Sequence, residues 1–299
     1  MKQPMYINTI VICIVLFVSV CKVTTAQQKK GLLWEITGKD MKEPAYLFGT
    51  VHLYDTTLYG LPQLPAGLLN KVSKVYFEMD FANVDQAELM AGVIIKDTTQ
   101  YLDKILDSTS LRSLHKLAAA SPMLKGMGNK IYKIKPLILM SWVAAGYTNA
   151  TTVDFELYRN ALAQKKPIGG LETTKEQMAA INAVPIVKQA DMLKKSLDES
   201  CSLEQQVKKL TEVYTKQELD NLMTVLNDNM PVDPSFDDAI RANRNVTMTN
   251  KIDSILRTEH PLVVVGAGHF GNHTGLIALL QQKGYTLKNV PVIIKKAHE

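Results

Sequence analysis

Tyr46-Leu47-Phe48-Gly49-Thr50-Val51-His52 is a short apolar strand that runs into a Gly-x-x-His motif, and it decides the fold together with a second copy of this pattern. The second copy is Leu262-Val263-Val264-Val265-Gly266-Ala267-Gly268-His269, near the other end of the chain. Its β-branched apolar run is typical of a strand buried on both faces of a sheet. Ligands of α/β proteins collect at the carboxyl ends of such strands, where glycine lets the backbone bend. We therefore expect both strands in one sheet, with His52 and His269 meeting at its edge.

Other stretches complete the sheet and surround it with helices. Strand patterns are expected at Leu32–Thr37, Ala45–Phe48, Val75–Met79, Pro167–Leu171 and Val290–Ile294, with Gly38–Pro44 as the turn between the first two. Helical patterns are expected at Gln86–Ala145, Val153–Ala163, Lys175–Asn229, Phe236–Leu256 and Thr274–Gln282, with breaks in the longer ones. The sequence thus predicts an α/β fold, in which residues 27–299 form one domain with a sheet built from both chain ends. A large helical section, at about residues 84–257, is inserted between them.

The first 26 residues have the pattern of a secretory signal peptide. Lys2 is followed by the apolar run Ile10–Val20 and by a cleavage pattern that ends at Ala26. This predicts an exported protein, periplasmic or extracellular. Two alternatives stay open, namely an uncleaved N-terminal anchor and a lipidated Cys21. No later stretch is apolar and long enough to predict a membrane span.

Composition restricts the class of protein further. The 299 residues include 34 Lys and Arg against 29 Asp and Glu, so the formal charge of +5 is too small to indicate a nucleic-acid partner. Only Cys201 of the three cysteines lies beyond the expected cleavage site, so no disulfide is expected within the exported chain. Composition says nothing about the oligomeric state.

A carboxylate can complete a site with the two histidines. Glu78 ends the strand Val75–Met79, where a charge is costly unless it is paired or bound to a metal. Two imidazoles and a carboxylate suit Zn²⁺, Mn²⁺ or Co²⁺. Such a site lowers the pKa of a bound water and polarises a carbonyl. The alternatives are structural histidines and a salt bridge at Glu78.

The motifs resemble those of the TraB/GumN family, which includes the TraB and PrgY pheromone-shutdown proteins and the animal Tiki proteins. The resemblance runs through nearly all of the chain beyond residue 26 and keeps the family's order. Its segments are Leu33–Ile36, Tyr46–Leu53, Val75–Asp80, Lys166–Thr173 with Glu176 and Gln177, Arg244 and Asn245, Val265–Gly271, Gly275 and Leu276, and Lys283–Tyr285.

This resemblance implies a fold related to the erythromycin-esterase and ChaN-like group and, for the Tiki-like members, a metal-dependent peptidase. It implies that His52, Glu78 and His269 are catalytic groups or metal ligands, and that Gly49 and Gly266 belong to the binding motifs. Glu172 and Arg244 become further residues of the pocket. His273 is either an additional ligand or a residue at a helix start.

Three side chains keep two interpretations each. Arg244 either binds a substrate carboxylate or oxyanion, or pairs with Asp237 or Asp238 on its own helix. Glu172 either acts as a base or anchors a ligand histidine, or caps the helix that follows it. Asp154, on the predicted helix Val153–Ala163, is expected to be either a solvated residue or a first-turn residue rather than a ligand.

Two functions from different classes follow. The first is an exported metallohydrolase acting on peptides or proteins through His52, His269 and Glu78. The second is a protein that binds and sequesters a peptide or haem without turnover.

Overall fold

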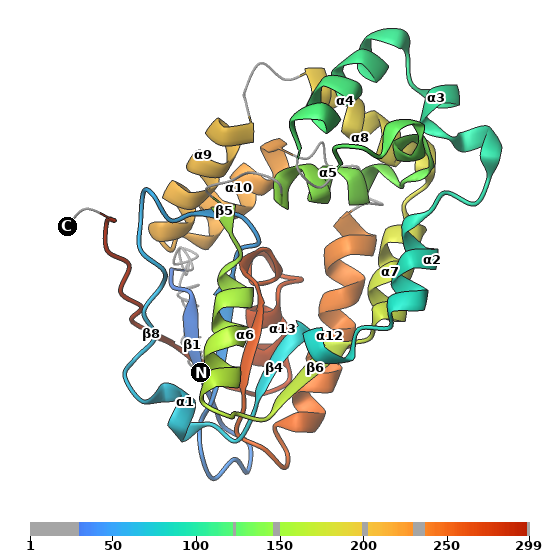
Figure 1. Cartoon of the computed structure of the whole chain (residues 1–299). Coiled ribbons are helices and arrows are strands. Elements are labelled where there is room, and N and C mark those ends of the chain that lie inside the picture. The colour runs from blue at the N-terminus through green and yellow to red at the C-terminus, as the bar shows by residue number, and fades with distance from the viewer. Residues whose placement is uncertain (1–29, 122–123, 146–149, 199–202, 230–236, 298–299) are drawn as a thin grey trace, which may run out of the picture.

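A six-stranded mixed sheet forms the centre of the molecule (Figure 1). The computed structural model describes residues 30–121, 124–145, 150–198, 203–229 and 237–297. In the strand order β6-β4-β7-β2-β1-β8, the strands are Ile168–Glu172, Val75–Met79, Leu262–Gly266, Ala45–Thr50, Leu33–Thr37 and Thr286–Val290. Two short strands, β3 (Tyr54–Asp55) and β5 (Ala150–Thr151), pair separately. The predicted α/β fold with strands from both chain ends is confirmed.

Four neighbouring strands, β6, β4, β7 and β2, run parallel, so their carboxyl ends meet at one edge. The register places Thr50 of β2 beside Gly266 of β7, and Met79 of β4 beside Glu172 of β6. Strand β7 is central because its run Leu262–Val265 is buried on both faces, as its β-branched composition predicts. Both Gly-x-x-His motifs therefore leave the sheet from adjacent strands at the same edge.

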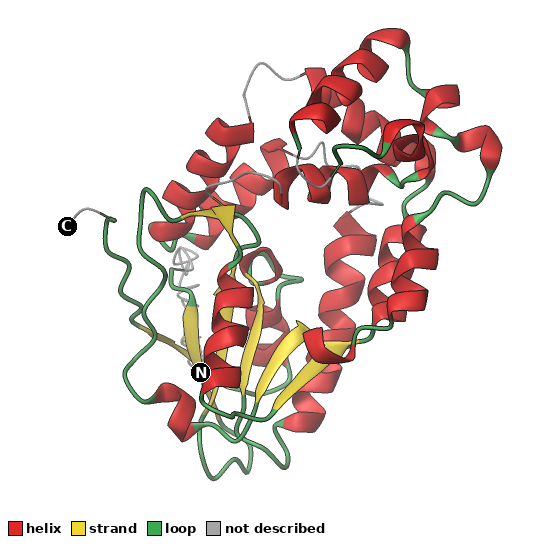
Figure 2. Cartoon of the chain, viewed as in Figure 1, coloured by secondary structure: helices red, strands yellow, loops and turns green. Residues whose placement is uncertain are grey.

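Helices cover the sheet and extend beyond it (Figure 2). The α-helices are α1 (Leu68–Lys71), α2 (Gln86–Val93), α3 (Leu102–Ile105), α4 (Ser108–Ala120), α5 (Pro136–Ala145), α6 (Val153–Ala163), α7 (Thr174–Ala183), α8 (Ile186–Asp198), α9 (Leu203–Thr215), α10 (Leu219–Asn229), α12 (Asn243–Ile255) and α13 (Leu276–Gln282). Short helices of other types are η1 (Phe81–Asn83), η2 (Thr98–Gln100), η3 (Gly128–Lys133), η4 (Asp238–Ala242) and η5 (Ala267–His269). In Figure 1, α6 lies in front of the sheet and α13 behind it.

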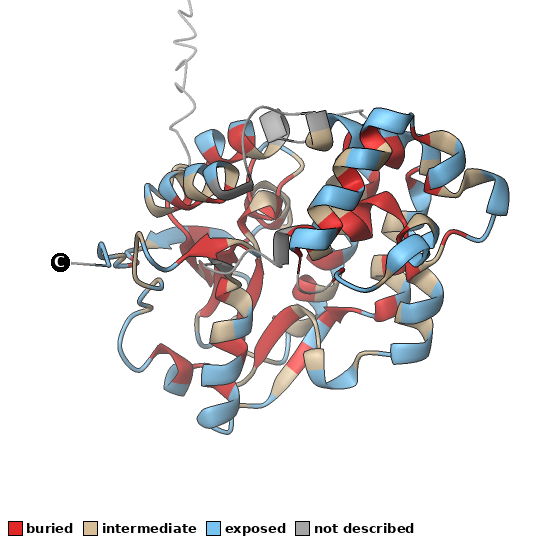
Figure 3. Cartoon of the chain, turned by 45° about the horizontal axis from the view of Figure 1, so that its top comes forward, coloured by how far each residue is buried: buried red, intermediate tan, exposed pale blue. Residues whose placement is uncertain are grey.

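Buried apolar side chains gather in two large groups. The sheet core contains the strands and the inner faces of α6, α12 and α13. The helical core lies apart from it, among α3, α4, α5 and α8, and includes the fully buried Leu114 and Leu139. Figure 3 shows buried residues along the strands and, separately, within this helical part. Helices α3, α4, α5 and α8 thus have apolar contacts of their own.

The last strand differs from the predicted Val290–Ile294. Strand β8 covers Thr286–Val290 and pairs with β1 at the edge of the sheet. It ends at Val290 because Pro291 has no backbone N–H to donate to a strand ladder. Beyond it, Ile293 makes a single bridge with Gln63. Leu287 is the one buried residue of β8, so the apolar pattern of this strand is too weak to indicate it.

Two predicted helices also begin differently. The stretch predicted as one helix up to Leu256 contains the π-helical turn η4 before α12. Helix α13 begins at Leu276 rather than Thr274, with Gly275 as its N-cap. Residues 1–26, Cys201 and Phe236 lie outside the described residues. Among the described helices, none is long and apolar enough to cross a bilayer.

Candidate active site

Glu78, Gly266 and His269 meet where β4 and β7 end. The Gly266 N–H donates to Glu78 Oε1 over 2.7 Å. His269 Nε2 lies 3.8 Å from the same oxygen. A Cβ at Gly266 would stand 3.2 Å from Glu78 Oε1, so glycine leaves room for the carboxylate to approach the backbone. The structure thus brings together Glu78 and one predicted histidine.

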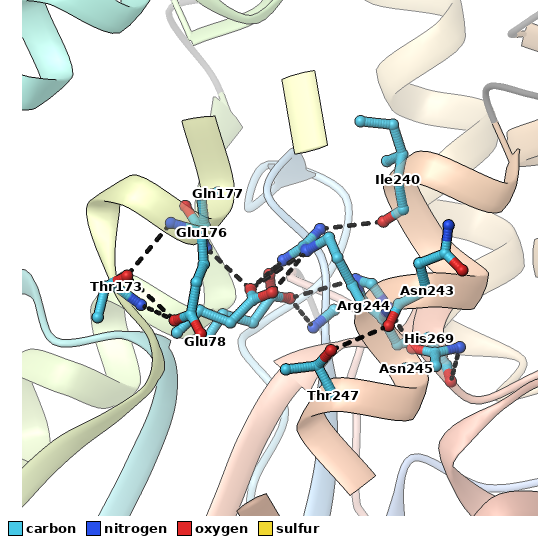
Figure 4. Close-up of polar contacts among 12 residues, drawn as sticks. Glu78, Thr173, Glu176, Gln177, Ile240, Asn243, Arg244, Asn245, Thr247 and His269 are labelled. Atoms are coloured by element: carbon cyan, nitrogen blue, oxygen red, sulfur yellow. Dashed lines mark hydrogen bonds and ion pairs between the residues drawn. The ribbon is translucent and has the colours of Figure 1, made fainter. Parts of the chain in front are cut away.

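Arg244 joins Glu78 to Glu172, as Figure 4 shows for Glu78. Its Nη2 lies 2.6 Å from Glu78 Oε2 and 2.5 Å from Glu172 Oε2, and its Nε donates to Glu172 over 2.9 Å. The Glu172 side chain is only 2% exposed. The alternative that Arg244 pairs with Asp237 or Asp238 is wrong, because its guanidinium contacts Glu78 and Glu172 instead. The π-helical turn η4 directly precedes α12, and such turns often occur at functional sites.

His52 pairs with Asp154, a residue that the sequence analysis did not select. His52 Nδ1 lies 3.3 Å from Asp154 Oδ2. Asp154 does lie in the first turn of α6, as expected, but it is not solvated, because its side chain is only 13% exposed. The N–H of Val153 bonds to the Val51 carbonyl and so holds the start of α6 beside the first motif. A local pattern could not indicate this pair, because its members come from distant segments.

The surroundings at this edge lower the pKa values of both Glu78 and His269. Burial raises the pKa of Glu78, but the charges of His269, Arg244 and His52, with the Gly266 N–H, outweigh it and lower that pKa to about 2. Burial is also the largest effect on His269 and lowers its pKa to about 4, although the Glu78 charge opposes this. At neutral pH the site therefore holds an ionised Glu78 and a neutral His269.

His52 shifts in the opposite direction. Neighbouring protein atoms lower its pKa by desolvation, but the hydrogen bond to Asp154 and the charges of Asp154 and Glu78 raise it to about 9. Solvent nevertheless reaches 64% of the side chain, so the Asp154 pair, rather than burial, governs this imidazole. The charges of His52 and Glu78 influence each other, which places the first motif within electrostatic reach of the second.

Gly49 has a packing role in this structure. A Cβ at Gly49 would stand 2.9 Å from the Phe270 ring and 3.0 Å from Ala267 Cβ. Both neighbours flank His269, so the missing side chain lets η5 pack directly on β2. The Gly49 carbonyl also accepts a hydrogen bond from the buried Tyr214 hydroxyl over 2.8 Å.

Asn245 is a second contact that the sequence analysis missed. Its Oδ1 lies 2.6 Å from His269 Nδ1, and the residue is only 2% exposed (Figure 4). The resemblance included Asn245 in a motif but suggested no contact. Each histidine of the site therefore has an oxygen partner at Nδ1, and these partners come from different helices.

The donor types at this edge fit a divalent metal. Imidazole Nε2 and carboxylate oxygen are common ligands of Zn²⁺, Mn²⁺ and Co²⁺, and metal-binding histidines usually have such a partner on the other ring nitrogen. His52 and His269 meet that condition through Asp154 and Asn245. Within the described part of the chain, however, no three His, Cys, Asp or Glu side chains form a group that could hold a metal. The residues fit by chemistry without forming a preassembled cluster.

The remaining histidines lie in other surroundings. His273 is exposed in the turn before α13. His115 is exposed and bonds to Tyr132, and His260 pairs with Glu43 over 3.2 Å. His298 lies outside the described residues.

Comparison with known proteins agrees with this α/β fold and its pair of Gly-x-x-His motifs. The profile of the TraB/PrgY/gumN family matches residues 32–289, and the chain belongs to this family. The chain is also similar to a protein named metalloprotease TIKI2 from Xenopus tropicalis, with 22% identity over 304 residues. That alignment covers 83% of this chain and 58% of the relative's length. No solved structure matches the chain, so the predicted kinship with the erythromycin-esterase and ChaN-like group remains a prediction.

Proposed function

We propose that this protein is an exported metal-dependent hydrolase that cleaves peptide bonds. The observation that carries the proposal is the group of Glu78, His269 and Arg244 at the sheet edge. His269 Nε2 faces Glu78 Oε1 at 3.8 Å, and Arg244 binds the other carboxylate oxygen. The similarity to a protein named a metalloprotease supports the same reaction class. Export rests on the sequence pattern of residues 1–26 alone.

His52, His269 and Glu78 would hold the metal, which we expect to be Mn²⁺, Co²⁺ or Zn²⁺. Such an ion, when bound, supplies an activated water and polarises the substrate carbonyl. The parallel pairing of β2 with β7 brings the Gly49 and Gly266 motifs to the same edge. We propose peptides or proteins as substrates, in keeping with the name of the relative.

The other residues of the site orient these groups. Arg244 holds Glu78 and Glu172 in one ion-pair network, so the Glu78 carboxylate keeps its charge and orientation although it is buried. Arg244 Nη1 donates one hydrogen to the Ile240 carbonyl, and a guanidinium Nη carries two. We propose that the second hydrogen stabilises an oxyanion, which is the role suggested by the sequence. Asp154 orients the His52 ring through Nδ1.

The test is elemental analysis of the purified protein after reloading with Mn²⁺, Co²⁺ and Zn²⁺. His52→Ala and His269→Ala should each lose a near-stoichiometric metal and metal-dependent peptide turnover while remaining folded. His260→Ala is the matched control, because this histidine pairs with Glu43 rather than with Glu78, His269 or Arg244. It should keep both the metal and the turnover. Undiminished turnover in the first two variants would contradict the proposed centre.

A second candidate is a protein that sequesters a peptide or haem. It is favoured by the lack of a preassembled metal group among the described residues. Saturable binding of a peptide that is recovered intact by mass spectrometry, by a folded protein that takes up no metal, would support this function. Recovery of cleaved peptide, dependent on His52, would exclude it.

A further inference from the structure

Asn245 links three parts of the site. It lies on α12 directly after Arg244, and it is almost completely buried. Its side chain contacts the His269 ring, the His269 carbonyl and the Thr274 carbonyl. One amide therefore connects α12 to η5 and to the turn that precedes α13.

The two carbonyl contacts fix the orientation of this amide. Asn245 Nδ2 donates to the Thr274 carbonyl over 2.8 Å and lies 3.4 Å from the His269 carbonyl. The opposite orientation would set Oδ1 against two carbonyl oxygens, and neither of these can donate a hydrogen bond. Oδ1 must therefore face His269 Nδ1, at 2.6 Å.

This orientation decides which ring nitrogen of His269 carries the hydrogen. Because an amide oxygen only accepts, the 2.6 Å contact requires the hydrogen on Nδ1. Nε2 then keeps its lone pair and is the nitrogen on the Glu78 side, 3.8 Å from Oε1. An aspartate at position 245 would accept the same hydrogen bond, but its second oxygen would face the two carbonyls without a hydrogen to donate.

We propose that Asn245 is a positioning residue that holds His269 in the Nδ1–H tautomer and turns its Nε2 lone pair toward Glu78. The catalytic consequence rests on the proposed function, whereas the tautomer is a property of the metal-free protein. Consecutive residues of α12 then have different tasks. Arg244 orients the carboxylate, and Asn245 orients the imidazole.

The direct test is ¹⁵N NMR of the histidine rings in metal-free protein at neutral pH, with the His269 signals assigned by their loss in His269→Gln. The wild type should show a protonated Nδ1 and an unprotonated Nε2. Asn245→Leu removes the acceptor, so the hydrogen should move to Nε2, where Glu78 can accept it. Asn245→Asp restores an acceptor and should restore the Nδ1–H form. Asn243→Ala is the matched control, because this exposed asparagine lies on the same helix, and it should leave the tautomer unchanged.

Two results would overturn the inference, namely an Nε2–H ring in the wild type or an unchanged tautomer in folded Asn245→Leu. If the leucine variant does not fold, Asn245→Ala gives the same comparison with less steric change, and the wild-type spectrum alone can still contradict the inference. In the metal-loaded protein, loss of this partner should lower kcat about 10- to 100-fold. A wild type that has the Nδ1–H tautomer but no turnover would refute the proposed function and leave the positioning role intact.

Discussion

Arg244 is the residue on which the charge balance of the site depends. Among the residues that the structure describes, Arg244 is the cation that contacts both Glu78 of β4 and Glu172 of β6. Each of these carboxylates is largely buried. Two buried carboxylates at adjacent strand ends would repel each other without it. The charges of His269 and Arg244 together lower the pKa of Glu78 to about 2, so the carboxylate stays ionised at any physiological pH.

Arg244→Met should therefore be strongly destabilising. Removing one partner of a buried ion pair costs about 3–5 kcal/mol in the free energy of unfolding, because the remaining charges stay buried. The loss should shrink as pH falls from the unfolded glutamate value of about 4.3 through about 2, where Glu78 becomes protonated in the wild type. Denaturant unfolding at several pH values measures both effects.

Arg257→Met is the control for this prediction. Like Arg244, Arg257 pairs with a carboxylate, which here is Asp253 of α12. The Arg257 side chain, however, is 72% exposed. We expect a change of at most about 1 kcal/mol. A similar loss in both variants would contradict the importance of burial at Arg244.

Asp154→Asn should lower the pKa of His52 in the metal-free protein, since the carboxylate contributes both the hydrogen bond and the charge that raise it to about 9. A raised pKa in the folded state stabilises the fold fully below the unfolded value of about 6.5, and this contribution disappears as pH rises through about 9. The variant should therefore flatten the dependence of stability on pH in that window, by an amount that solvent screening keeps small.

An NMR titration of the His52 ring, together with unfolding at pH 6 to 10, measures this prediction. Glu43→Gln, next to His260, should leave the pKa of His52 unchanged. A His52 titration that is the same in Asp154→Asn and wild type would show that Asp154 does not control this ring.

At the scale of elements, the site depends on how closely η5 packs on β2. Gly49 has Phe270 and Ala267 as its nearest neighbours, and these residues enclose the short turn that ends at His269. A strand and a turn can approach this closely only where one of them lacks a side chain. The first motif thus supports the histidine of the second.

Gly49→Ala should shift η5 and destabilise the protein by about 1–3 kcal/mol, the usual cost of overpacking. The His269 ring signals should change as well. Gly60→Ala is the matched control, because its Cβ would meet only a carbonyl oxygen at 3.7 Å, and it should stay within about 0.5 kcal/mol. Thermal unfolding and NMR compare the two variants with the wild type. Equal melting temperatures of the two variants, with an unchanged His269 signal in Gly49→Ala, would contradict the packing role.

At the scale of the whole molecule, two apolar cores suggest two cooperative units. The sheet core and the helical core contain different side chains, for example Ile252 and Leu114. Cooperative units that open separately often coincide with such groups. The site lies on the sheet core, at the edge where the parallel strands end.

Leu114→Ala should increase amide exchange in α3, α4, α5 and α8 and leave β4 and β7 protected. Truncating a fully buried leucine costs about 2–5 kcal/mol, and the loss should act on the unit that contains it. Ile252→Ala should have the reverse effect. Hydrogen exchange measured by mass spectrometry compares the two variants, and a uniform increase over the whole chain in both would show one cooperative unit.

Much of the fold could be predicted from local patterns. The run Leu262–Val265 indicated a central strand because β-branched apolar residues fit a sheet buried on both faces, and Val153–Ala163 is helical as its spacing indicated. The predicted position of strand β8 is wrong because Leu287 is its one buried residue, which leaves a weak apolar pattern. Glu78 and His269 lie 3.8 Å apart, as expected for residues at the ends of parallel strands, because Glu78 lies at the end of β4 and His269 in the turn that follows β7.

The sequence by itself determined the strands, the two Gly-x-x-His motifs and the edge of the sheet where they meet, because these follow from periodicity and chain direction. Only the tertiary structure decided the partners, namely Arg244 with Glu78 and Glu172, Asp154 with His52, and Asn245 with His269. The physical reason is that each pair joins segments far apart in the chain. A hydrogen bond or ion pair of this kind depends on distance in the fold, and it leaves no periodic pattern in the sequence.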